Sequence, residues 1–189
     1  MKRIGCTTTC LRMLFPATRP KNYPKVGDDL TLRQVPALYA EKLGVHNVEL
    51  WSPHFDRLTS GFAREIRRAA ETAGSVITNI QLDGVRYNLS DPDAEERQKS
   101  VNLVKLWMER AAMCGATSLR ANTGGQRGES FDLNATAECF GQLAEFGQQI
   151  GVKILVENHG GHSTQPENVV AIVKAVDNSW CRALPDFGN

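Results

Sequence analysis

Short apolar runs alternate along this chain with longer stretches of helical spacing. The runs are rich in β-branched and aliphatic residues, which is typical of buried strands. They predict six strands, at Arg3–Thr7, Asn47–Trp51, Val76–Leu82, Thr117–Asn122, Lys153–Asn158 and Cys181–Asp186. Between them, apolar positions three and four residues apart predict five helices, near residues 31–44, 60–74, 91–111, 133–150 and 164–176.

Local signals mark several of the predicted helix starts. Thr31 and Gln34 form a capping-box pattern ahead of the first helix. Asp91, which is followed by a proline, is expected to cap the third helix. Thr164 stands three residues before Glu167 and predicts a second capping box at the start of the fifth helix.

A strand followed by a helix, repeated along the chain, indicates parallel strands joined by right-handed crossovers. Two α/β architectures compete: a doubly wound open sheet and a (β/α)8 TIM barrel. The first strand is not followed by a phosphate-binding glycine loop, which counts against a nucleotide-binding open sheet. The only glycine-rich stretch, residues 122–128, is a weak phosphate signal and is more simply read as a plain turn.

The spacing of the predicted strands bears on how complete a barrel would be. Strand starts are separated by about 36 residues on average, so eight units would need on the order of 285 residues, against the 189 of this chain. We therefore expect residues 1–189 to form one incomplete barrel domain of about six strands and five helices, without the last two strand-helix units. Open barrel edges of this kind predict self-association.

Composition excludes several classes of protein. The net charge is +1 and the charges are mixed along the chain, so a basic footprint for nucleic acid or an anionic membrane is missing. No run reaches the roughly 18 apolar residues of a spanning helix, and threonine and arginine interrupt the amino terminus where a signal peptide is apolar. The five cysteines contain no CxxC pair, which favours reduced thiols and a cytoplasmic location.

Polar side chains gather where the predicted strands end, which is where ligands bind in parallel α/β folds. The clearest case is Glu157, which terminates an apolar strand that should be buried on both faces. Burying a carboxylate is costly unless a cation or a hydrogen-bond donor meets it. Asp186 repeats the arrangement on the next strand, although an aspartate before Phe187 and Gly188 also suits a simple turn. Together the two carboxylates suit a hard divalent cation such as Mg²⁺ or Mn²⁺.

Five segments carry a resemblance to a known family: RIGCTTT, VPALYAEKLGVHNVELW, SLRANTGG, ILVENHGG and LPDFGN. Together they resemble the sugar isomerase and epimerase superfamily, the xylose isomerase-like TIM barrels. The resemblance implies that Glu157 and Asp186 bind a divalent metal, Mn²⁺ or Mg²⁺. Further family ligands, a histidine from the seventh strand and a glutamate from the eighth, have no counterpart in these residues.

The resemblance also implies a reaction. The family abstracts a proton next to the carbonyl of a sugar or sugar phosphate and passes through an enediolate. Glu157 would then be both a metal ligand and a catalytic acid/base. Substrate-binding roles are expected for a further set of residues: Asn122, His159, Trp51, Asn189 and His54.

Some of these assignments have alternatives. His159 reaches a substrate hydroxyl or braces Glu157, and Trp51 forms an apolar wall for a sugar ring or caps the core. His54 faces the barrel mouth or lies exposed in a loop. Asn122 and Arg120 share a predicted strand, and the family pattern favours Asn122 as the one that faces the lumen, with Arg120 turned away.

Two rival functions follow from the same residues. An apurinic-endonuclease-like phosphodiesterase would need more histidine ligands, including one where this chain has Asn189, and more positive charge to bind phosphates. A barrel that binds a sugar or another metabolite without turnover would need no second catalytic carboxylate.

Overall fold

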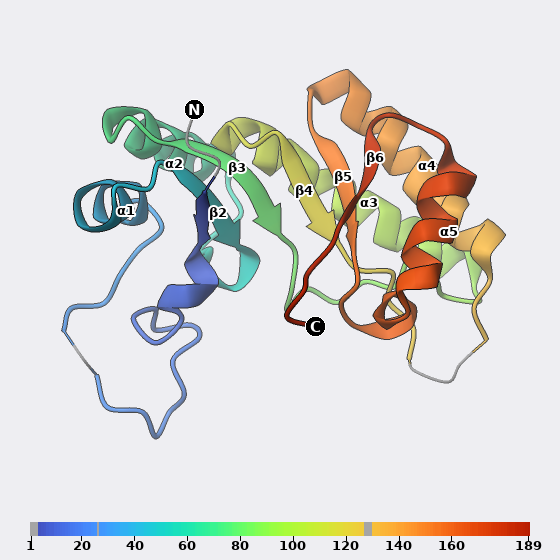
Figure 1. Cartoon of the computed structure of the whole chain (residues 1–189), viewed down its shortest axis with the longest axis horizontal. Helices are drawn as coiled ribbons and strands as arrows, with labels where there is room; N and C mark the ends of the chain where they lie inside the picture. The colour runs from blue at the N-terminus through green and yellow to red at the C-terminus, as the bar shows by residue number, and fades with distance from the viewer. Residues whose placement is uncertain (1–3, 26, 127–129) are drawn as a thin grey trace. The chain divides into compact units, whose positions relative to one another are not determined.

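In the part of the chain that the structure describes, six strands and five helices alternate (Figure 1). The computed structural model describes residues 4–25, 27–126 and 130–189. The chain divides into two compact units. The first comprises Met1–Gly84 and Arg110–Thr117, and the second comprises Val85–Glu109 and Ser118–Asn189.

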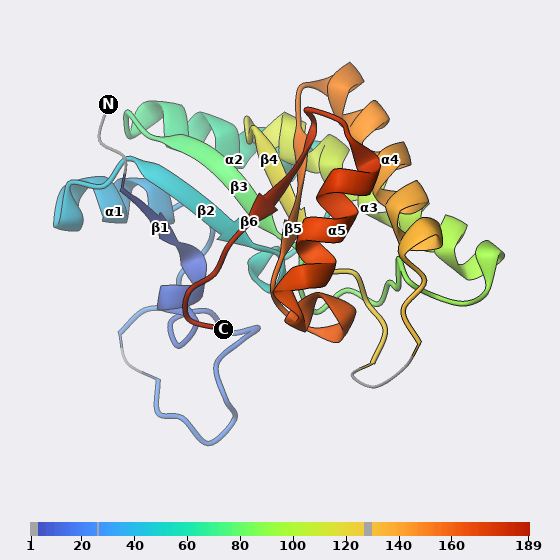
Figure 2. The same cartoon turned by 45° about the vertical axis from the view of Figure 1, so that its right-hand side comes forward.

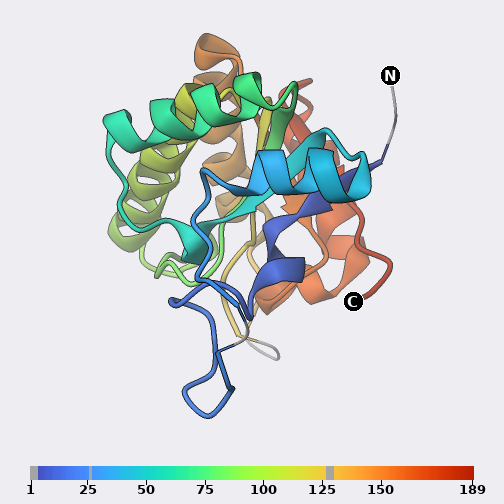
Figure 3. The same cartoon turned by 90° about the vertical axis from the view of Figure 1, so that its left-hand side faces the viewer.

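The first unit is built on three parallel strands, which Figure 2 shows side by side. They are β1 (Gly5–Thr7), β2 (Asn47–Trp51) and β3 (Val76–Gln81), with β2 between the other two. Two helices, α1 (Val35–Leu43) and α2 (Ser60–Thr72), follow β1 and β2 in the chain and lie on the same side of these strands (Figure 3). The short 3-10 helices η1 (Thr8–Leu11) and η2 (Ser52–His54) lead directly out of β1 and β2.

The predicted capping box of Thr31 and Gln34 does not cap the first helix, because the pair lies in the turn before it and the N-cap residue Gln34 makes no side-chain capping hydrogen bond. The side-chain oxygen of Gln34 accepts hydrogen bonds from both the backbone N–H and the hydroxyl of Thr31, at 2.9 Å each. Residues 31–34 form a turn, and the helix itself starts at Val35 with proline in its first turn. Gly44 ends it in the left-handed conformation, at φ 62°, which glycine adopts without strain.

A long segment joins η1 to α1 and loops away from the strands (Figure 3). Phe15 and Leu32 are buried and tie its two ends to the core of the first unit. Arg19 and Asp29 form an ion pair at 2.8 Å across the loop. The two ends of the segment are therefore packed against the unit, whereas residues 20–25, 27 and 28 between them are exposed.

The second unit also contains three parallel strands, β4 (Ser118–Ala121), β5 (Lys153–Glu157) and β6 (Cys181–Leu184), with β5 in the middle. Helix α3 (Ala94–Cys114) begins in this unit, and its last turn belongs to the first. Helices α4 (Leu133–Ile150) and α5 (Pro166–Val176), with the 3-10 helix η3 (Gly161–Thr164) ahead of α5, cover one face of β5 and β6 (Figure 1).

Alternation along the strands gives the second unit two different faces. Leu119 and Ala121 of β4 and Ile154 and Val156 of β5 point to one face and are completely buried. This is the apolar face that the helices cover. The intervening positions, which include Glu157, point the other way, so the polar residues of these strands collect on the face that the helices leave uncovered.

The prediction of six strands and five helices is confirmed, and every strand is found within two residues of its predicted bounds. The predicted caps of α3 and α5 are wrong as well. The carboxylate of Asp93 accepts a hydrogen bond from Glu95 N–H at 2.7 Å and caps α3, whereas Asp91 forms the preceding turn by accepting from Asp93 N–H. Thr164 donates to the carbonyl of Gly161 within η3, so it does not cap α5. No helix in the described part of the chain is long and apolar enough to cross a membrane.

Candidate metal and catalytic site

A buried ion pair marks the carboxyl ends of the strands in the second unit. Arg120 of β4 and Glu157 of β5 are 4% and 5% exposed, and Arg120 Nε lies 2.7 Å from Glu157 Oε2. Arg120 lies opposite Leu155 in the strand register, and Glu157 lies two residues further on, so both side chains leave the same face. The buried carboxylate predicted from the sequence is thus met by a cation that the chain itself supplies.

Asp186 lies beside Glu157 after the end of β6. Burial raises the pKa of Glu157, the charges of Arg120 and His159 oppose that rise, and hydrogen-bond contact with Asp186 adds to it. Two carboxyl groups in contact are close enough to bind one cation between them. The structure therefore brings together the two residues that the sequence analysis assigns to a metal.

The position of Asp186 is fixed through Asn158. Asn158 Nδ2 donates to the carbonyl oxygen of Asp186, and Asp186 N–H donates to Asn158 Oδ1, both at 2.8 Å. Gly188 N–H donates to Asp186 Oδ1 at 2.7 Å and forms a turn behind the carboxylate. The amide of Asn158 thereby links the end of β5 to the segment after β6, a role that the sequence analysis missed.

The donor set fits part of a divalent metal site. Mg²⁺ and Mn²⁺ take oxygen ligands, and Mg²⁺ is commonly held by one or two carboxylates with water and substrate oxygens completing the shell. Glu157 and Asp186 supply two such carboxylates. Within the described ranges, no group of three or more histidine, cysteine, aspartate or glutamate residues could hold an ion. The two residues therefore fit as part of a ligand set.

Three of the predicted substrate-binding residues lie in the same unit. His159 is exposed, and its Nδ1 lies 3.2 Å from Asn189 Oδ1. Asn189 Nδ2 also donates to the carbonyl of Asn158 at 3.2 Å. Asn122 receives a hydrogen bond from Arg120 Nη1 to its Oδ1, at 3.3 Å. These contacts place all three at the carboxyl ends of the strands, where their substrate roles stay predictions.

The prediction that Arg120 turns away from Asn122 is wrong. Residues two apart on a strand point to the same face, and the hydrogen bond between these two side chains shows that they do. Counting from the apolar positions Leu119 and Ala121 would have found this from the sequence, because Arg120 and Asn122 occupy the alternate positions. Arg120 is thus the main residue of the site that sequence reasoning passed over.

The described part of the glycine-rich stretch is a turn that packs against the loop after β5. Gly124 and Gly125 have φ values of 77° and 73°, and His162 N–H donates to the carbonyl of Gly124 at 3.1 Å. Ser163 N–H donates to the buried hydroxyl of Thr123 at 3.0 Å. The reading as a plain turn fits these contacts, although Arg127, Gly128 and Glu129 lie outside the described residues.

The first unit carries a separate polar network on its strands. Gln81 Nε2 and Asn79 Nδ2 donate to Glu49 Oε2, at 3.0 and 3.4 Å. The hydroxyls of Thr7 and Thr9 donate to Gln81 Oε1, at 3.1 and 3.2 Å. Amide and hydroxyl groups thus orient the Glu49 carboxylate, and the sequence analysis gave this network no role.

Trp51 and His54 lie in the first unit. Trp51 Nε1 donates to Asp83 Oδ2 at 2.7 Å, and its ring meets the His54 ring edge-on at 5.0 Å. The half-buried ring thus has an apolar side against its neighbours and a polar end that is hydrogen-bonded. A sugar-binding role for Trp51 stays a prediction.

The expectation of an exposed loop histidine at position 54 is wrong, because His54 is 2% exposed. Its ring stacks on Phe15 at 3.7 Å, and its two nitrogens lie 3.0 Å from the hydroxyls of Thr8 and Thr18. Burial lowers the pKa of His54 from 6.5 to about 4, so the neutral ring is favoured. In this arrangement both ring nitrogens are engaged, and His54 ties η2 to the long segment after β1.

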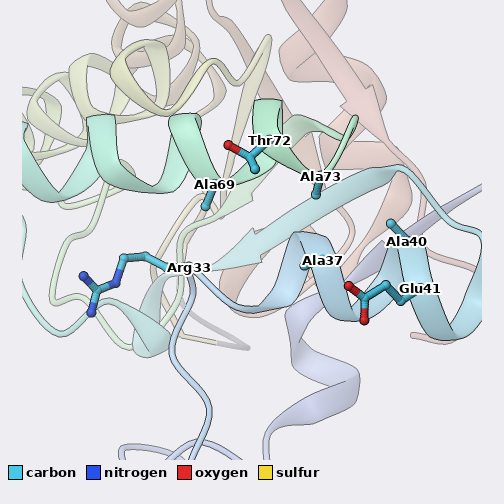
Figure 4. Close-up of a pocket in the computed structure, with 7 residues that line it drawn as sticks. All are labelled: Arg33, Ala37, Ala40, Glu41, Ala69, Thr72 and Ala73. Carbon is cyan, nitrogen blue, oxygen red and sulfur yellow. The ribbon is translucent and has the colours of Figure 1, made fainter.

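A cavity of about 430 Å³ lies between α1 and α2 in the first unit (Figure 4). Four alanines contribute most of its wall: Ala37 and Ala40 from α1, and Ala69 and Ala73 from the end of α2. It belongs to the helix layer, away from the strand ends, so we do not assign it to the site.

Comparison with known proteins gives one family. Residues 37–189 match the family model described as the xylose isomerase-like TIM barrel. A search of curated proteins gives no match.

Three solved structures illustrate the similarity of fold. A D-psicose 3-epimerase crystallised in the presence of D-fructose is 17% identical, with a TM-score of 0.69 over 83% of this chain. The 3-keto-D-glucoside 4-epimerase YcjR from E. coli is 14% identical, with a TM-score of 0.64 over 89%. The probable 3-DHS dehydratase AsbF from Bacillus anthracis is 15% identical, with a TM-score of 0.65 over 98%.

At these sequence identities the three structures show similarity of fold alone. That fold is a partial TIM barrel of six parallel strands and five helices. The chain spans 58%, 66% and 63% of the length of the three proteins, respectively. The family model covers most of the chain and includes both the strand that ends in Glu157 and the segment that carries Asp186. The chain therefore belongs to the xylose isomerase-like TIM barrel family.

Proposed function

We propose that this chain carries metal-binding and catalytic residues of a divalent-metal-dependent sugar or sugar phosphate isomerase or epimerase. The observation that carries the proposal is the placement of Glu157 beside Asp186 at the carboxyl ends of neighbouring strands, with Glu157 almost fully buried. The epimerase activities of two proteins of similar fold agree with it. Mn²⁺ or Mg²⁺ is the proposed ion, because the donors are carboxylate oxygens.

In this proposal each residue of the site has a separate task. A bound ion would supply electrostatic stabilisation of the negative charge that develops on the substrate oxygens. Glu157 takes the proton from the carbon next to the carbonyl, and Asp186 holds the ion with it. Asn122, His159 and Asn189 donate to or accept from substrate hydroxyls. Arg120 holds the Glu157 carboxylate in place through the 2.7 Å ion pair.

Epimerisation also requires an acid/base that returns the proton to the opposite face of the substrate. We assign no residue of this chain to that step. Since one positioned acid/base contributes about 10² to 10⁴ in rate, the chain is expected to turn over slowly or not at all by itself.

A second candidate is a barrel that binds a sugar or another metabolite without turning it over. The ion pair with Arg120 gives the buried Glu157 carboxylate a cation from the chain itself, and this favours a site that binds without a metal. The two candidates differ in whether sugar binding depends on a metal.

Calorimetric titration with Mn²⁺ tests the proposal. We expect one site in the wild-type chain, lost in Glu157→Gln and retained in Glu145→Gln, which changes an exposed carboxylate of α4. Ketose epimerisation should be measured with added Mn²⁺ for the same three chains. Any activity of the wild type should be lost in Glu157→Gln and retained in Glu145→Gln. Sugar binding that is indifferent to a chelator, with no Mn²⁺ site, would favour the binding module over the enzyme.

A further inference from the structure

Among the described residues, Arg120 forms an ion pair with the proposed metal ligand Glu157. Its side chain lies on the same strand face as Glu157 and is 4% exposed. It contacts Glu157 through Nε and donates through Nη1 to Asn122. A single planar guanidinium therefore engages one proposed metal ligand and one proposed substrate-binding residue.

The Arg120 guanidinium contacts one oxygen of the Glu157 carboxylate, Oε2. Arg120 Nε lies 2.7 Å from Oε2 of Glu157, a charge-assisted distance, and both side chains are desolvated. An ion that coordinated through Oε2 would lie close to the like charge of Arg120, so coordination through the other oxygen, Oε1, is favoured while this pair persists. Coordination through both carboxylate oxygens would bring the ion against the guanidinium or displace it.

We propose that Arg120 is a positioning residue that limits Glu157 to one-oxygen coordination and so makes the site prefer Mg²⁺ or Mn²⁺ over Ca²⁺. Ca²⁺ takes six to eight oxygen ligands, often with a carboxylate bound through both oxygens, whereas Mg²⁺ demands a compact octahedral shell. A glutamate that coordinates through one oxygen suits the shell of Mg²⁺ and weakens the binding of Ca²⁺. This inference rests on the proposed metal-dependent function.

The planarity of arginine matters to the argument. Its fork of N–H donors reaches Glu157 and Asn122 from one rigid group, whereas a lysine ammonium is a single point on a flexible stem. Arg120→Lys therefore keeps the charge and loses the double contact. Arg120→Met removes the charge with a side chain of similar length.

The test is the ratio of Mn²⁺ to Ca²⁺ affinity, measured by calorimetry and by competition with the Mn²⁺ electron paramagnetic resonance signal. Mutation of a residue that orients a metal ligand commonly weakens metal affinity about 10- to 100-fold. We expect Arg120→Met to weaken Mn²⁺ binding by about tenfold while Ca²⁺ binding stays equal or tightens, so that the ratio falls by at least that factor. Arg182→Met, an exposed arginine of β6, changes the net charge equally and should leave the ratio within about twofold.

Because removal of one partner of a buried ion pair can prevent folding, Arg120→Lys supplies the second measurement. A lysine variant with a reduced ratio supports the proposal even if the methionine variant is unfolded by circular dichroism. An unchanged ratio in a folded Arg120 variant, with Mn²⁺ still bound through Glu157, overturns the role of Arg120 and leaves the metal site intact. Absence of Mn²⁺ binding in the wild-type chain instead overturns the proposed function and this inference with it.

Discussion

Acidification should destabilise the first unit through His54, and the effect is large enough to measure. In the folded chain this ring is buried, and its pKa is lowered from 6.5 to about 4. The unfolded chain binds the proton more readily, so the contribution of His54 is fully present above pH 6.5 and is lost as the pH falls toward 4. Between pH 8 and pH 5, protonation of the unfolded histidine lowers the free energy of unfolding by about 2 kcal/mol.

The assay is urea unfolding at pH 8 and at pH 5, followed by tryptophan fluorescence, since Trp51 packs edge-on against His54. The His54→Asn variant loses the stack on Phe15 and should be less stable than the wild type at pH 8 by about 2 kcal/mol or more. It has no proton to gain, so the wild-type advantage should shrink by about 2 kcal/mol at pH 5.

His46→Asn is the matched control, because His46 is an exposed histidine of the same unit. The difference in free energy of unfolding between the wild type and His46→Asn should be the same at pH 8 and at pH 5. An advantage of the wild type over His54→Asn that is equal at pH 8 and pH 5 would refute the reasoning, because it would mean that the folded ring protonates as easily as the unfolded one.

Two further predictions concern the backbone. Gly161 has a φ of 55°, and a Cβ there would collide with the backbone of Gly124, so Gly161→Ala should lower the free energy of unfolding by about 2 kcal/mol or more. A Cβ added at Gly141 of α4 would meet no atom within 4 Å, so Gly141→Ala should raise the free energy of unfolding by about 0.5 to 1 kcal/mol, measured by urea unfolding. Asp93→Ala removes the hydrogen bond to Glu95 N–H and should cost about 1 kcal/mol and reduce the helical circular dichroism signal; an unaffected helix would show that another residue caps α3.

The strands could be predicted closely because each is an apolar run bounded by polar residues. Helix starts were less secure, since Asp91 and Asp93 both form local side-chain to backbone hydrogen bonds and only one of them caps the helix. The pairing of Glu157 with Asp186 followed from strand order alone. The surroundings of His54 could not be predicted, because Phe15 and Thr18 come from an irregular segment whose path no periodicity encodes.

Arg120 shows a different kind of limit. The alternation of residues along the strand predicts that Arg120 lies on the same face as Asn122. It does not predict which acidic residue Arg120 contacts. Nothing in the order of residues says that Nε meets Oε2 of Glu157 rather than another acceptor, because that depends on the register between β4 and β5. Register follows from the packing of the apolar face, where Leu119 lies opposite Ile154.

The segments ENHGG and PDFGN are joined by hydrogen bonds into one structural unit. This explains why they contain polar residues in addition to the two proposed metal ligands. Asn158 exchanges two hydrogen bonds with the backbone of Asp186, and Asn189 donates to the carbonyl of Asn158. Each bond joins the loop after β5 to the segment after β6, so hydrogen bonds between asparagine side chains and the backbone set the spacing between Glu157 and Asp186. Two carboxylates that repel each other can stay adjacent because these bonds hold the chain on which each is mounted.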